Sequence, residues 1–123
     1  MSAWDEDELR RVAAPQELEI APVRRNGELR TPTTIWAVRA DDDLYVRAAY
    51  GPSTGWHRVA RASGEGHVSA GGVDKDVRFE DADPSVYAAV DAAYRAKYGQ
   101  YASIVDGITN EQARATTLRL TPR

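Results

Sequence analysis

The chain has 123 residues, with 16 basic and 19 acidic side chains spread along it and no cysteine. This length suits one ordinary domain over residues 1–123, and the absence of cysteine excludes disulfides, thiolate metal sites and a cysteine nucleophile. No run approaches the roughly twenty apolar residues that cross a bilayer, and no basic stripe of the kind that binds nucleic acid is present. We therefore expect a cytoplasmic protein with neither a membrane nor a nucleic-acid partner.

The first third of the chain predicts one helix and a strand hairpin. Asp5 and Glu8 have the spacing of a capping box, and Pro15 ends the helix that they begin. Apolar and polar residues then alternate over 17–23, which is typical of a strand. Asn26-Gly27 is the strongest hairpin signal in the sequence, and it predicts a returning strand over 33–40.

The middle of the chain predicts alternating turns, strands and a short helix. Asp41 to Asp43 form a turn, and the third strand follows over 44–50. A helix over 56–63 ends at Gly64. Gly71-Gly72 joins two further strands, which we place at 65–70 and 73–81.

The last third of the chain predicts the longest helix and a final strand. Asp83-Pro84 begins the helix and Gly99 ends it. The pattern over 100–112 does not assign a structure; one interpretation is a loop that packs through Tyr101, Ile104 and Val105. A last strand is expected over 115–121. Five or six antiparallel strands joined by hairpins favour an α+β barrel over an open sheet, because closure removes exposed strand edges.

Several motifs, in this order, resemble those of known proteins. They are Trp4 with Glu8-Leu9, Glu17-Leu18-Glu19-Ile20, Arg30-Thr31-Pro32, Ile35-Trp36, Leu44-Tyr45-Val46-Arg47, Ala70-Gly71-Gly72-Val73, Ala92 to Gly99, and Ala113 to Leu120. The chain resembles the flavin-binding split barrels, which include pyridoxamine-phosphate oxidases and deazaflavin-dependent reductases. Over nearly its full length it resembles an uncharacterised bacterial family, domain of unknown function 2255. The resemblance implies a split β-barrel of about six mainly antiparallel strands with flanking helices.

Two motifs of the deazaflavin-dependent branch have counterparts here. Asn26-Gly27-Glu28-Leu29-Arg30 resembles its Ser-Gly-x-x-Arg turn, with Asn in place of Ser. Its Trp-x-x-Asn-Leu helix start is matched only by Trp56, because Val59 and Ala60 stand where Asn and Leu are typical.

The best candidate site is the loop 51–55 with the helix that it opens. A helix N-terminus binds anions, and guanidinium groups bind phosphate oxygens two at a time. Thr54 either caps the helix or contacts a phosphate, Arg61 adds a donor, and Trp36 and Tyr50 offer flat walls for a ring. The candidate cofactor-binding residues are Arg30, Thr33, Arg47, Trp56, His57 and Arg58. The alternative is that the threonine only caps, the arginines are solvated and the tryptophans fill the core.

Other candidate sites have weaker support. Arg24-Arg25 and Arg58 to Arg61 are the densest basic pieces, and we expect them to be solvated surface. The two histidines, His57 and His67, are too few and too far apart for a metal site, so we expect no metal.

Three functional hypotheses follow. The first is a homodimeric oxidoreductase that binds FMN or a deazaflavin cofactor. In this hypothesis Tyr87, Tyr94 and Tyr98 form the dimer seam; the alternative for this stripe is ordinary packing of the helix on the barrel. The second is a cofactor-free module that binds a small molecule or a protein, which the departures at Val59 and Ala60 favour. The third is a cofactor-independent enzyme with His57 as its base.

Overall fold

The computed structural model describes residues 4–49 and 54–123. Seven antiparallel strands form one sheet in the order β2-β1-β5-β6-β7-β4-β3. The strands are β1 (Leu18–Pro22), β2 (Thr33–Ile35), β3 (Ala37–Ala40), β4 (Asp43–Val46), β5 (Glu65–Ala70), β6 (Val73–Asp81) and β7 (Leu118–Pro122). The helices are α1 (Glu6–Ala13), α2 (Gly55–Ser63), α3 (Tyr87–Tyr98), which follows the 3-10 turn η1 (Pro84–Val86), α4 (Ala102–Thr109) and α5 (Glu111–Arg114).

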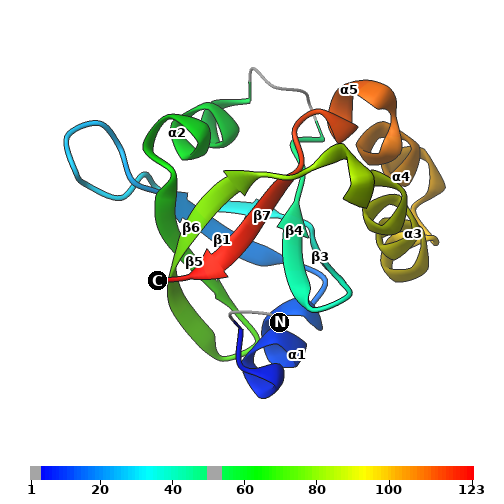
Figure 1. Ribbon diagram of the computed structural model, residues 1–123, viewed down its shortest axis with the longest axis horizontal. Helices are drawn as coiled ribbons and strands as arrows, with labels where there is room; N and C mark the ends of the chain where they lie inside the picture. The colour runs from blue at the N-terminus through cyan, green and yellow to red at the C-terminus, as the bar shows by residue number, and fades with distance from the viewer. Residues whose placement is uncertain (1–3, 50–53) are drawn as a thin grey trace.

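The two edge strands of the sheet are neighbours along the chain. β2 pairs with β1 and β3 pairs with β4, and only Trp36 separates β2 from β3. The two edges therefore meet at this residue, and the sheet curls into a nearly closed barrel with a seam (Figure 1). The predicted α+β split barrel is confirmed, with seven strands where about six were expected.

The single strand predicted over 33–40 is wrong, because Trp36 breaks it. The Trp36 ring stacks on Tyr98 with a centroid distance of 3.9 Å and an interplanar angle of 1°. Its carbonyl oxygen accepts a hydrogen bond from the Tyr94 hydroxyl at 3.0 Å. The tertiary contacts of Trp36 with α3 thus replace the strand ladder at this position.

Local sequence signals placed several elements correctly. The Asp5 carboxylate caps α1 by accepting from the Glu8 backbone N–H at 3.2 Å, as the capping box predicts. Helix α2 ends at Gly64, whose φ of 73° is the left-handed conformation that favours glycine. Strands β5 and β6 have the predicted bounds, and both residues of the Gly71-Gly72 turn have positive φ.

The interpretation of 100–112 as a loop is wrong, because this segment forms α4 and part of α5. The Asn110 side chain caps α5 by accepting from the Ala113 N–H at 2.8 Å. Val105 is buried as expected and Ile108 is buried beside it, whereas Ile104 is half exposed. Because α5 extends to Arg114, β7 begins at Leu118 and not at 115. Strand β4 ends at Val46, short of the predicted 50.

The buried residues form two clusters on opposite faces of the sheet. The first fills the barrel and includes Leu9 from α1 and Trp56 from α2. The second lies between the sheet and the helical layer of α3 and α4, and includes Tyr45, Tyr94 and Ile108. Figure 1 shows α3, α4 and α5 gathered on one side of the barrel, with α1 and α2 at its two ends.

A buried ionic network joins the barrel to this helical layer. Arg47, which directly follows β4, is 1% exposed and pairs with Asp91 of α3, which also pairs with Arg114 of α5. Arg47 further donates to Thr117 Oγ1 at 2.8 Å and to the carbonyl oxygen of Ile108 at 3.1 Å. Burial alone would raise the pKa of Asp91, but hydrogen bonds from the two arginines outweigh it and hold that pKa below its usual range.

Lys97 of α3 is a partly buried cation on the same side of the sheet. Its ammonium donates to the carbonyl oxygens of Ala13 and Ala37, at 2.7 Å and 2.6 Å. Burial lowers the pKa of Lys97 to about 8. These two hydrogen bonds connect α3 to the end of α1 and to the start of β3.

In the described parts of the chain, no helix is long and apolar enough to cross a membrane.

Candidate functional site

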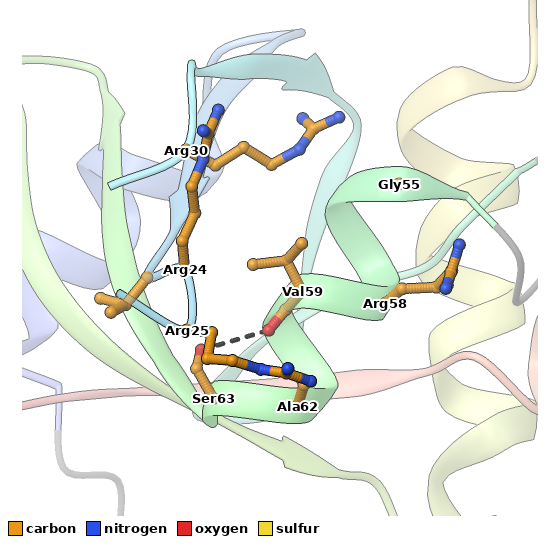
Figure 2. Close-up of a pocket in the computed structure, with 9 residues that line it drawn as sticks. Arg24, Arg25, Arg30, Gly55, Arg58, Val59, Ala62 and Ser63 are labelled. Carbon is orange, nitrogen blue, oxygen red and sulfur yellow. Dashed lines mark hydrogen bonds between the residues drawn. The ribbon is translucent and has the colours of Figure 1, made fainter. Parts of the chain in front are cut away.

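A basic hollow lies between the β1–β2 loop and helix α2. Its volume is about 610 Å³. It is lined by Val23, Arg24, Arg25, Arg30, Gly55, Arg58, Val59, Ala62 and Ser63, and we call it the arginine hollow (Figure 2). A volume of this size is ordinary for a small-molecule site.

The loop that carries three of these arginines has a defined turn. The Gly27 N–H donates to the Arg24 carbonyl oxygen at 2.9 Å, and the Arg24 N–H donates to the Glu28 carbonyl oxygen at 2.7 Å. Asn26 accepts from the Glu28 N–H through its side chain, and Gly27 has a φ of 90°. The predicted Asn-Gly turn is thus present, and it brings Arg24 and Arg25 to the same side of the molecule as α2.

The charge of the arginine hollow is not neutralised within the described chain. Most other arginines pair with carboxylates, such as Arg39 with Glu6 and Arg61 with Asp81. Arg24, Arg25, Arg30 and Arg58 form no ion pair with any described residue, and no acidic residue lines the hollow. A concave surface with charge of one sign concentrates counter-ions, so this hollow favours an anionic ligand.

Arg30 holds a fixed position against the first residue of α2. Its Nη1 donates to Thr33 Oγ1 at 2.8 Å. A Cβ atom built on Gly55 would lie 2.8 Å from Arg30 Nη2, so the absence of a side chain at Gly55 allows this approach. The first turn of α2 holds no acidic residue. Backbone N–H groups at a helix start carry partial positive charge, and together with the guanidinium they favour an anion.

A second, more apolar hollow lies beside the seam of the barrel. Its volume is about 300 Å³, and we call it the aromatic hollow. It is lined by Thr33, Thr34, Ile35, Trp36, Arg47, Ala49, Thr54, Trp56, Ile104 and Ile108. The stack on Tyr98 fixes the Trp36 ring, and Trp56 is almost fully buried. Flat, rigid walls of this kind suit a planar ring system.

The two hollows share a boundary. Arg30 lines the arginine hollow and is hydrogen-bonded to Thr33, which lines the aromatic hollow. Thr54 and Trp56 line the aromatic hollow, whereas Gly55 between them lines the arginine hollow. A ligand that spans this boundary would place a ring beside the tryptophans and an anionic group beside Arg30.

The structure divides the six predicted site residues into three groups. Arg30 and Arg58 line the arginine hollow, and Thr33, Arg47 and Trp56 line the aromatic hollow. His57 lines neither; it is 1% exposed, with Nε2 2.9 Å from the Thr116 carbonyl oxygen. Arg47 lines the aromatic hollow, but its guanidinium is engaged by the buried network described above. Tyr50 and residues 51–53 of the predicted loop lie outside the described residues.

Sequence reasoning missed two arginines and one helix of the site. Arg24 and Arg25 are exposed, as expected for solvated surface, but they also line the arginine hollow and form no ion pair with the described residues. The Asn26-Gly27 turn was the signal that could have placed them opposite α2. Ile104 and Ile108 of the aromatic hollow belong to α4, in the segment that was interpreted as a loop.

The remaining candidate residues lie away from the two hollows. His67 pairs with Asp76 and Asp74, and the hydrogen bonds that it donates to these carboxylates, that to Asp76 foremost, raise the pKa of His67. Tyr94 and Tyr98 are buried within the chain, so ordinary packing on the barrel accounts for them. Among residues 4–49 and 54–123, no group of three or more His, Asp or Glu side chains is placed to hold a metal ion.

Residues 8–120 match a family of uncharacterized proteins conserved in bacteria, DUF2255. The chain belongs to this family. No curated protein matches the sequence significantly.

Solved structures share the fold of this DUF2255 protein at low sequence identity. The heme storage protein HutZ from Vibrio cholerae is 16% identical with a TM-score of 0.67, covering 100% of this chain and 92% of HutZ. An FAD-binding protein from Mesorhizobium loti is 16% identical with a TM-score of 0.58, covering 98% and 91%. An F420 reductase is 17% identical with a TM-score of 0.55, covering 98% and 96%. These likenesses establish the split-barrel fold.

Proposed function

We propose that this protein binds a planar, phosphorylated cofactor of the flavin or deazaflavin type and acts as an oxidoreductase. The observation that carries the proposal is that the two hollows share a boundary. Arg30 lines the arginine hollow and is hydrogen-bonded to Thr33, which lines the aromatic hollow. The names of three structural neighbours, an F420 reductase, an FAD-binding protein and a heme storage protein, support a planar ligand.

The residues present fit such a cofactor by their chemistry. Trp36 and Trp56 would contact the ring, and Arg30 with the start of α2 would bind the phosphate. The cofactor would supply the electron or hydride transfer, and the protein would orient it and exclude water from one face. We also propose that the protein is cytoplasmic and, from the family resemblance, that it forms a homodimer.

We expect Arg30→Ala to weaken FMN binding by about 10-fold to 100-fold, because hydrogen bonds to charged groups contribute roughly 1.5–3 kcal/mol. The measurement is quenching of flavin fluorescence in a titration. Arg78→Ala is the matched control, since Arg78 also forms no ion pair with the described residues and does not line the arginine hollow. Equal affinity of wild type and Arg30→Ala, with both folded, would contradict the site.

A cofactor-free module that binds a small anion is the second candidate function. Val59 lines the arginine hollow at a position where the deazaflavin-dependent motif has Asn, so the polar contact of that motif is replaced by an apolar one. This candidate predicts that the protein binds small phosphorylated compounds but gains no affinity from the flavin ring. Titration with FMN and with ribose 5-phosphate separates the two candidates.

A further inference from the structure

The arginine hollow extends along the whole length of α2. Gly55, its first residue, and Ser63, its last, both line the hollow. At a rise of 1.5 Å per residue these two ends are about 12 Å apart. A single phosphate group makes hydrogen bonds only over about 3 Å, so it cannot contact both ends at once.

The loop arginines are distributed over this length. Figure 2 shows Arg30 extending toward Gly55 at the start of α2, whereas Arg25 extends toward Ala62 in its last turn. Arg24 rises from the same loop toward Arg30. The guanidinium of Arg58 points away from these three, so the inference depends on the loop arginines.

The described chain provides no counter-ion for these charges. Glu28 is the only acid of the loop and forms no ion pair with a described residue, and Arg61, in the last turn of α2, is already paired with Asp81. Several like charges around one concave surface repel one another, and an anion with several charged groups relieves the repulsion at each of them.

We propose that the arginine hollow binds a ligand segment with two or more anionic groups in a row, such as a diphosphate, and so selects polyanionic ligands over monophosphates. This proposal extends the proposed function and rests on it in one respect, namely that the planar ring lies in the aromatic hollow. Arg30 would bind the anionic group nearest the ring, and Arg25 would bind the group farthest from it. Arg25, although exposed, is then a specificity-determining residue.

The test is calorimetric titration with inorganic tripolyphosphate and with orthophosphate at fixed ionic strength. We expect tripolyphosphate to bind at least about tenfold tighter, since each additional charge-assisted contact contributes roughly a factor of ten or more. Arg25→Ala should remove most of this preference, while Arg78→Ala, outside the hollow, should leave both affinities unchanged. Arg25 is exposed, and its substitution removes no ion pair within the described chain. Equal affinities for the two anions, or a preference that persists in Arg25→Ala, would overturn the proposal.

Titrations of the same variants with FMN, FAD and a deazaflavin cofactor separate this proposal from the proposed function. Tripolyphosphate selectivity that depends on Arg25, without binding of FMN, FAD or a deazaflavin cofactor, would support the proposal and reject the flavin function. FMN binding that depends on Arg30, without tripolyphosphate selectivity, would support the flavin function and overturn the proposal.

Discussion

Asp91→Ala is expected to lower the free energy of unfolding by about 3–5 kcal/mol, the usual loss when one partner of a buried ion pair is removed. The substitution leaves Arg47, which is 1% exposed, without its carboxylate inside the protein. It also releases Arg114, and so loosens the contact between α3 and α5. The loss is measured by urea denaturation followed by circular dichroism.

Asp106→Ala is the matched control for this network. Asp106 of α4 also pairs with an arginine, Arg95 of α3, but at 3.8 Å between exposed side chains. Surface pairs contribute little, so we expect a change within about 0.5 kcal/mol. A loss of less than about 1 kcal/mol in Asp91→Ala would show that the network does not hold the helical layer on the barrel.

Gly71→Ala is expected to cost at least about 3 kcal/mol, from backbone strain together with steric overlap. Gly71 has a φ of 58°, which L residues rarely adopt. A Cβ atom there would lie only 1.9 Å from the Arg11 carbonyl oxygen, so α1 or the β5–β6 turn must move. Thermal and urea denaturation measure the loss.

Gly27→Ala separates the contribution of backbone strain from that of steric overlap. Gly27 also has positive φ, at 90°, but a Cβ atom built there meets nothing within 4 Å. We expect this variant to lose only the conformational cost of about 1–2 kcal/mol. If Gly71→Ala were no more destabilising than Gly27→Ala, the contact between α1 and the β5–β6 turn would not constrain the fold.

The elements that sequence predicted well carry local signals. Asp5 caps α1, Gly64 ends α2, and the Gly71-Gly72 turn places β5 and β6 in register. Each signal acts within a few residues, so no tertiary information is needed to recognise it. The split barrel itself followed from the resemblance and the hairpin order together.

The elements that sequence missed depend on tertiary contacts. Nothing near Trp36 in the sequence marks it as a break, since its stack on Tyr98 forms only when α3 packs on the barrel. The start of α4 lacks a side-chain cap, so the sequence there carries no local signal for the beginning of a helix. The arginines of the β1–β2 loop resemble solvated charges in sequence, and only the fold places them opposite α2.

Two-dimensional ¹⁵N NMR of the three tryptophan indoles during an FMN titration tests the central claim most directly. Trp36 and Trp56 line the aromatic hollow, whereas Trp4 lies in the barrel core with its indole N–H donated to the Leu120 carbonyl oxygen. Binding of the flavin ring in the aromatic hollow predicts saturable shifts of the Trp36 and Trp56 signals with Trp4 unchanged. Saturating FMN that moves neither the Trp36 nor the Trp56 signal would contradict the proposed site.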